Sequence, residues 1–230
     1  MTHSKHSTST TPAPGGGLAG RREWTALGVL MLPLLLVSMD VSVLYFAIPA
    51  ISADLEPSGT QQLWIFDIYA FVLAGLLMTM GSLGDRIGRR KLLLIGAAAF
   101  GTASVMAAYA GSAEMLIAAR AVLGIGGATL MPSTMAIIRT MFTDPGQRAK
   151  AIGLWSGVMT GGIALGSVMS GVLVEYFWWG SVFLVNLPAM VLLLVLGPIL
   201  LPESKNPEPG RFDLLSVPLS MAAVLPSSTA

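Results

Sequence analysis

The chain has 230 residues, of which 54% are hydrophobic and 11% are charged, and its mean hydropathy is +0.75. Soluble domains carry roughly 25% charged residues, so this composition excludes a soluble fold and predicts a membrane protein. The formal net charge of +1 gives no support for nucleic-acid binding. The sequence has no cysteine, which excludes disulfides, Cys-ligated zinc and thiol catalysis.

Residues 1–22 are rich in Ser, Thr, Pro and Gly and have too little apolar surface to offset the entropy of ordering. They are predicted to form a disordered tail, in which His3 and His6 are solvated and bind no metal. The first apolar stretch after this tail is about 20 residues long, beyond the core of a secretory signal peptide. We therefore expect it to remain as a membrane anchor.

Six apolar windows follow the tail, and each is long enough to cross a hydrocarbon core of about 30 Å as a helix. Helices are expected because backbone groups in lipid must pair internally and the windows lack the alternation of barrel strands. The sequence thus predicts an all-α membrane protein with a six-span bundle over residues 23–201. The windows are residues 26–48, 62–83, 92–111, 113–138, 150–174 and 179–201.

Residues 202–230 are predicted to hold a cytoplasmic linker and the truncated start of a seventh helix. Their apolar stretch is interrupted by Pro218 and ends at Pro226, which leaves it shorter than the about 20 residues that a span needs. An interfacial amphipathic helix is the alternative, but the stretch lacks the basic polar face that such helices carry.

The positive charges are sorted by side. Of the thirteen Lys and Arg residues, all except Arg120 lie in the tail or in loops on one side of the predicted membrane. The opposite loops carry Asp54, Glu56 and Glu175 and no Lys or Arg. Because short loops rich in Lys and Arg stay in the cytoplasm, we expect a multi-pass protein of the inner or plasma membrane with a cytoplasmic N-terminus.

Asp40, Asp67 and Arg120 lie inside the predicted spans, where an ionisable side chain is expensive and indicates a functional site. At 1.5 Å per residue, Asp40 and Arg120 both lie roughly 10–12 Å from the outer ends of their helices. We therefore expect them to pair. The pair either fixes helix register alone, or serves as a proton site in which Arg120 sets the pKa of Asp40. Asp67 lies nearer the interface and is either hydrated or part of transport.

The turn between the second and third windows is short and basic. Its glycines allow a tight reversal and close helix approach. Asp85 is expected to accept hydrogen bonds from backbone donors at a nearby helix N-terminus. The residues of interest are Gly81, Gly84, Asp85, Arg86, Gly88, Arg89 and Arg90, followed by Lys91.

The fifth window carries small residues at intervals of four. Gly153, Gly157 and Gly161 form one line, and Gly162 and Gly166 lie on a neighbouring line. Such spacing lets two helices approach closely, so packing or gating is expected here.

The chain contains none of the phosphate-loop, HExxH, GxSxG or GxGxxG signatures. We accordingly expect a protein that is not an enzyme and that needs no cofactor or metal.

Taken together, these motifs resemble the major facilitator superfamily, and within it the fourteen-span drug:proton antiporters. Residues 81–91 look like the superfamily's signature loop. Residues 39–43 and 63–69 are similar to the antiporters' first-span and second-span motifs, and residues 120–128 resemble the fourth-span motif with its buried arginine. Gly153, Gly162, Gly166 and Gly171 stand where the fifth-span motif has glycines, whereas Ser167 and Ser170 depart from it.

The resemblance implies the N-terminal half of a major facilitator fold and proton-coupled efflux of lipophilic cationic drugs. Asp40 would accept the proton with Arg120 as its partner, Asp67 would assist, Trp64 and Tyr69 would contact substrate, and the basic loop would act as a latch. The expected partners are the lipid bilayer, protons, cationic drugs and the missing C-terminal half or another transporter chain.

Because the family continues through further spans, the 230-residue chain is expected not to transport alone. Two alternatives remain open. One is a carrier for another small solute, and the other is a non-transporting fragment that interacts with an intact transporter.

Overall fold

The computed structural model describes residues 18–203, which form seven α-helices and no strand. Six segments are long and apolar enough to cross a membrane, with α6 and α7 together supplying the last. The predicted all-α, six-span architecture is thus confirmed. The helices are α1 Arg21–Leu55, α2 Gly59–Ile87, α3 Arg89–Ala108, α4 Ala113–Met141, α5 Pro145–Tyr176, α6 Ser181–Leu184 and α7 Asn186–Leu200.

At most of their ends the helices extend beyond the predicted windows. Hydropathy detects only the apolar centre of a helix, and polar residues continue the helix on either side of that centre. The sixth window differs in kind, since it is divided at Val185 into the short α6 and the longer α7. Of the predicted tail, residues 1–22, the part up to residue 17 lies outside the described residues, and α1 already includes Arg21 and Arg22 at its other end. The predicted seventh helix also lies outside the described residues.

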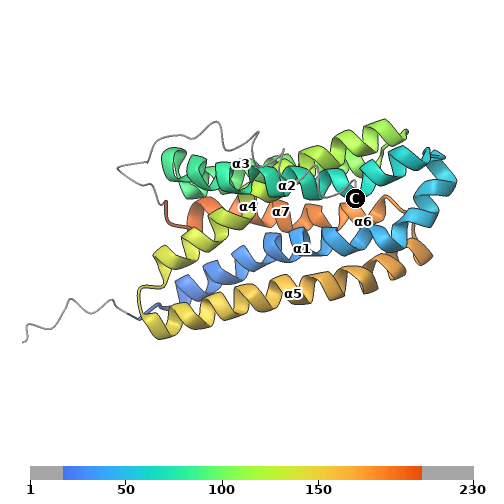
Figure 1. Ribbon diagram of the computed structural model, residues 1–230. Coiled ribbons are helices and arrows are strands. Elements are labelled where there is room, and N and C mark those ends of the chain that lie inside the picture. Colours follow the sequence, from blue (N-terminus) through green and yellow to red (C-terminus); the bar gives the residue numbers. More distant parts are fainter. Residues whose placement is uncertain (1–17, 204–230) are drawn as a thin grey trace, which may run out of the picture.

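The helices pack as two groups joined through the centre of the bundle. On one side α1 packs along α5 and α7, and on the other α4 packs along α2 and α3. Figure 1 shows α5 running beside α1 along one edge of the molecule. The buried core comes mainly from α1, α3 and α4, whereas α2 and α5 are the least buried of the spans.

The seam between α1 and α5 depends on small residues. A Cβ added at Gly162 would lie 2.7 Å from the Cβ of Ser38, and one at Gly166 would lie 2.6 Å from the carbonyl oxygen of Met39. These distances are shorter than real side chains tolerate, so both glycines are what allows this approach.

Two hydroxyl groups bond across the same seam. Ser42 Oγ donates to the carbonyl oxygen of Ile163 at 2.6 Å, and Ser170 Oγ donates to the carbonyl oxygen of Val43 at 2.6 Å. Ser170, which departs from the fifth-span motif, thus contributes a buried interhelical bond. The seam holds the segment of α1 that carries Asp40.

The other glycine line of α5 faces open space. Gly153, Gly157 and Gly161 have no atom within 4 Å of an added Cβ, and neither does Gly171, which lies on neither line. Gly153 and Gly157 line a shallow apolar groove beside Leu35 and Leu154. Among the glycines of the fifth window, close approach to another helix therefore involves Gly162 and Gly166 only, and the expected packing role of Gly153, Gly157 and Gly171 stays a prediction.

We expect Gly166→Ala to destabilise the bundle by about 1–3 kcal/mol, because the added methyl group must displace the backbone of α1. Gly157→Ala is the matched control, since the same methyl group meets open space on the same helix. Thermal unfolding of the detergent-solubilised chain should show a lower midpoint for Gly166→Ala alone. Equal midpoints for the two variants would contradict the tight seam.

The two ends of the bundle differ in charge. At one end, the basic end, lie the start of α1, the α2–α3 turn, the α4–α5 loop and the end of α7. Ala19 N–H donates to Gln147 there, and Arg22 donates to the carbonyl oxygen of Ile199. At the opposite, acidic end, Trp179 Nε1 donates to Asp54 at 2.7 Å and Gln61 donates to Glu114.

Candidate functional site

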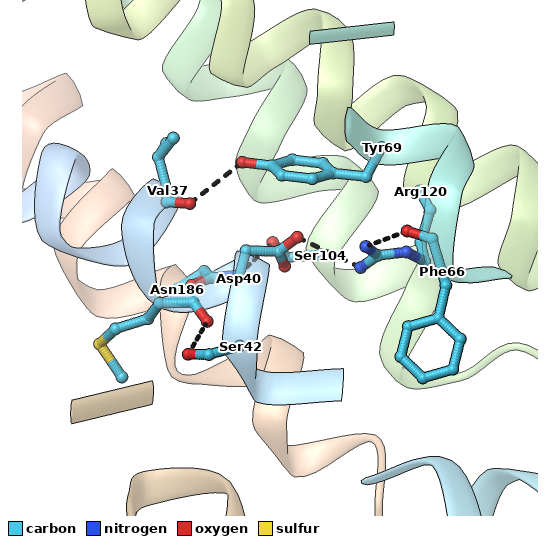
Figure 2. Close-up of polar contacts among 9 residues, drawn as sticks. Val37, Asp40, Ser42, Phe66, Tyr69, Ser104, Arg120 and Asn186 are labelled. Carbon is cyan, nitrogen blue, oxygen red and sulfur yellow. Dashed lines mark hydrogen bonds and ion pairs between the residues drawn. The ribbon is translucent and has the colours of Figure 1, made fainter. Parts of the chain in front are cut away.

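A buried ion pair lies between α1 and α4. Arg120 Nη1 donates to Asp40 Oδ2 at 3.2 Å, and both side chains are 2% exposed. Figure 2 shows the two side chains pointing toward each other from their helices. The structure thus brings together the two residues whose equal depth in the sequence suggested pairing.

Arg120 also contacts α2. Its Nη2 lies 3.5 Å from the carbonyl oxygen of Phe66, and its guanidinium lies 5.2 Å from the centre of the Tyr69 ring, within the range of a cation–π contact. Tyr69 Oη in turn donates to the carbonyl oxygen of Val37 at 3.1 Å. The ion pair, Tyr69 and Val37 therefore connect α1, α2 and α4 at one level of the bundle.

Small residues on α4 allow this arrangement. A Cβ added at Gly124 would lie 2.8 Å from the carbonyl oxygen of Tyr69, and one at Gly127 would lie 3.2 Å from Tyr69 Oη. The two glycines follow Arg120 by one and two helical turns, so the motif after the arginine serves to bring α2 against α4.

A partly open cavity of about 270 Å³ lies beside the pair. Aromatic and aliphatic side chains form most of its wall, which also includes Arg120 and the exposed residue Asp67. Its lining residues are Val41, Leu44, Tyr45, Leu63, Phe66, Asp67, Tyr69, Ala70 and Arg120. Apolar and aromatic walls with one carboxylate are suited to a lipophilic organic cation.

The predicted substrate residues fall in different places. Tyr69 is buried beneath Arg120 and lines the cavity. Trp64 does not line it; its side chain is 42% exposed and its ring packs edge-on against Phe71 at a centroid distance of 6.4 Å. Phe66 and Tyr45, which sequence reasoning did not single out, form the aromatic wall instead, with ring centroids 5.3 Å apart.

The α2–α3 turn reverses at Gly88, whose φ of +110° favours glycine. Asp85 forms an ion pair with Arg89 one turn later, at 2.5 Å between Oδ1 and Nη2. The absence of a side chain at Gly84 leaves room for Arg89, because a Cβ at Gly84 would lie 3.0 Å from Arg89 Cδ. Gly81 packs loosely against Pro132 of α4, and Arg86 lies in the last turn of α2.

The expectation that Asp85 binds backbone donors at the next helix is wrong. Asp85 bonds to a guanidinium, and a charge-assisted bond of that kind is stronger than one to a neutral amide. The acid at the start of α3 is Glu203 instead, whose Oε1 accepts the backbone N–H of Arg90 at 3.1 Å. An acid at a helix N-terminus offsets the partial positive charge there.

Arg90 fastens the turn to the end of α7. Its guanidinium lies 3.5 Å from Glu203 Oε2 and donates to the carbonyl oxygens of Leu201, at 3.1 Å, and Pro198, at 3.3 Å. Sequence reasoning missed Glu203, although the signal was available as an acid placed on the same side of the membrane as the basic turn.

Glu203→Ala should accelerate hydrogen exchange at the start of α3, because it removes the acceptor of the Arg90 N–H. Exchange of the peptide covering residues 85–92, measured by mass spectrometry, tests this expectation. Glu175→Ala, which removes an exposed acid at the opposite end, should leave that peptide unchanged. Identical exchange in the parent chain and in Glu203→Ala would show that Glu203 does not hold the turn.

Among the described residues, no three His, Cys, Asp or Glu side chains lie close enough together to hold a metal ion.

Comparison with known proteins identifies related chains. The model of the Major Facilitator Superfamily matches residues 30–223. The multidrug efflux pump LfrA of Mycolicibacterium smegmatis is 54% identical over 218 residues, which cover 95% of this chain and 42% of the relative. The methyl viologen resistance protein SmvA of Salmonella typhimurium is 45% identical over 76% of this chain and 35% of its own length.

The puromycin resistance protein pur8 of Streptomyces alboniger is 38% identical over 86% of this chain and 39% of its own length. The chain thus spans about two fifths of the length of these curated relatives. The family match, the six membrane-length helices and the signature turn agree, and the chain belongs to the major facilitator superfamily of multi-pass membrane transporters.

Proposed function

We propose that this chain is the N-terminal half of a carrier that exports lipophilic cationic drugs in exchange for protons. The observation that supports this most is the Asp40–Arg120 pair, which is buried in the bundle beside a mostly apolar cavity that Arg120 helps to line. The printed names of the relatives, a multidrug efflux pump and two resistance proteins, support drug export.

Asp40 is the proposed proton carrier because it is the acid in the centre of the bundle and has a single ionic partner. When the carboxylate takes up a proton it becomes neutral, and its attraction to Arg120 weakens. Arg120 stays charged, since a guanidinium does not lose its proton in proteins. Proton uptake would thus loosen the link between α1 and α4, and proton release would restore it.

Asp67 and the aromatic wall are the proposed contacts for the drug. Asp67 is exposed and lines the cavity, and the rings of Tyr45 and Phe66 offer faces to a cation. A cationic drug and a proton at Asp40 would then occupy neighbouring positions around Arg120. When Asp40 carries a proton, its carboxyl group no longer balances the charge of Arg120, and Arg120 would repel a cationic drug. The carrier would therefore hold either the drug or the proton at one time.

The turn between α2 and α3 is proposed as a latch. It joins the start of α3 to the chain that follows α7 through Arg90, Leu201 and Glu203, so these two segments would move together while the bonds hold. By the positive-inside rule the basic end of the bundle faces the cytoplasm, and the N-terminus lies there with it.

The sparsely buried faces of α2 and α5 are the proposed contact surfaces for the rest of the carrier. Superfamily carriers bind substrate between two six-span halves, and the relatives are more than twice as long as the matched region. On this proposal the 230-residue chain has no transport activity by itself.

The test measures ethidium efflux from cells that lack their own drug pumps. A carrier of the relatives' length that contains this chain should lower ethidium accumulation, and collapse of the proton gradient should abolish that effect. The 230-residue chain alone, produced at the same membrane level, should not lower it. Efflux that persists without a proton gradient would refute proton coupling, and export of neutral solutes but not cations would indicate a carrier for another solute.

A further inference from the structure

A second, much smaller cavity lies on the other side of Asp40. It measures about 10 Å³, which is the space that a single water molecule needs. The 270 Å³ cavity beside Arg120, here called the drug-side cavity, is lined from α1, α2 and α4, whereas the small one is lined from α1, α5, α6 and α7. Arg120 lines the first and Asp40 the second, so the ion pair lies between the two. The lining residues of the small cavity are Met39, Asp40, Val43, Met169, Leu173, Val182, Val185 and Asn186.

Only two of the lining residues, Asp40 and Asn186, have strongly polar side chains, and as whole residues they are 3% and 4% exposed. Asn186 Nδ2 donates to Ser104 Oγ at 3.1 Å, and Arg120 donates to Asp40 Oδ2. The remaining oxygens, Asp40 Oδ1 and Asn186 Oδ1, have no hydrogen-bond donor within residues 18–203. Both residues are almost fully buried, and an acceptor in such a place without a donor carries a cost in free energy that a bound donor would remove.

We propose that one water molecule occupies this cavity and donates its two O–H groups to Asp40 Oδ1 and Asn186 Oδ1. Water meets the requirements of the site, because a buried water needs at least two polar partners and the rest of the wall is apolar. A metal cation does not, since Na⁺-sized and larger ions take several oxygen ligands and this cavity offers two. Asn186 is then a positioning residue for the water.

The proposal deepens the proposed function, because it gives Asp40 a proton route that avoids the drug. Leu173, Val182 and Val185 lie where α5 ends and α7 begins, so the water stands between Asp40 and the acidic end of the bundle. A proton arriving from that end bonds to the water oxygen while one of the water's own protons passes to Asp40 Oδ1. A neutral water and a neutral carboxyl group remain.

The charges around Asp40 favour a proton that arrives from the acidic end of the bundle. Arg120 approaches from α4 and Tyr69 from α2, both on the drug side. From α5, α6 and α7 the neighbours of Asp40 in the small cavity carry no charge. A proton reaching Asp40 through the small cavity therefore meets no fixed cation, whereas one arriving through the drug-side cavity must pass Arg120.

The test is pH-difference infrared spectroscopy of the 230-residue chain in lipid nanodiscs. Asp40→Asn assigns the carboxyl band of Asp40, and water labelled with heavy oxygen assigns any water band that changes with it. We expect a water O–H band that appears with the Asp40 band and shifts on isotope substitution. Absence of an isotope-sensitive band would overturn the proposal.

Two variants remove the water in different ways. Asn186→Leu deletes one acceptor, and Val182→Ile fills the cavity with one carbon while both oxygens remain. Each should abolish the water band and shift the Asp40 carboxyl band, so the test survives a folding failure of either. Ser133→Ala, which removes a buried hydroxyl of α4 outside the cavity, should change neither band.

The outcomes separate this inference from the function on which it rests. If the Asp40 band titrates but no water band accompanies it, or if both cavity variants leave the water band unchanged, the water site is wrong and the proton carrier stands. If no carboxyl band is lost in Asp40→Asn at any pH, Asp40 does not exchange protons, and both proposals fail.

Discussion

Asp40→Asn is expected to reduce proton-driven drug efflux to the background level while leaving the amount of carrier in the membrane unchanged. Asn keeps the size of the side chain and an oxygen that can accept the Arg120 Nη1 bond, so the local structure should persist. It lacks a group that binds and releases a proton. Efflux of ethidium driven by an imposed pH gradient, measured in proteoliposomes with a carrier of the relatives' length, provides the readout.

A second measurement separates coupling from binding. Exchange of labelled for unlabelled drug across the membrane involves no net proton movement, and it should survive in Asp40→Asn. Glu175→Gln, an exposed acid at the end of α5, is the matched control and should retain both activities. Gradient-driven efflux at the parent rate in Asp40→Asn would rule out Asp40 as the proton carrier, and loss of drug exchange as well would assign Asp40 to drug binding.

The pairing of Asp40 with Arg120 could be anticipated because helices have a fixed rise and charges in the membrane need partners. The two residues lie at equal depth in their helices, and this places them at one level of the bundle. Few other ionisable residues lie inside the spans, so Asp40 had few possible partners. The cavities beside the pair were beyond sequence reasoning. They depend on the rotation of each helix about its axis, and apolar residues here face either protein or lipid, so hydropathy does not fix that rotation.

The same ambiguity explains the two glycine lines of α5. Gly157 and Gly166 belong to equally regular small-residue patterns, yet only Gly166 lies against α1. Spacing indicates that a close approach is possible and does not say which line is used. Asn186 was overlooked for a related reason, because a single uncharged polar residue in the first half of an apolar window shows no partner until Ser104 and Asp40 are seen beside it.

Arg120→Met should destabilise the bundle by about 3–5 kcal/mol, because removing one partner leaves the other as an uncompensated buried charge. The side chain of Asp40 is 2% exposed and has no other hydrogen-bond donor in the described part of the chain. The contact with the Tyr69 ring and the bond to Phe66 are lost as well. Thermal unfolding in detergent should show the loss, and Arg139→Met, the same change at an exposed position, should stay within roughly 0.5 kcal/mol of the parent.

The double variant Asp40→Asn with Arg120→Met distinguishes a charge effect from a packing effect. If the loss in Arg120→Met arises from the unpaired carboxylate, a neutral amide at position 40 should recover a large part of it, since burying an amide costs far less than burying a charge. If the loss arises from packing against Tyr69, the second change should recover nothing. Recovery of stability without recovery of efflux would show that the pair's contribution to the fold and its contribution to transport are separate properties of the same two side chains.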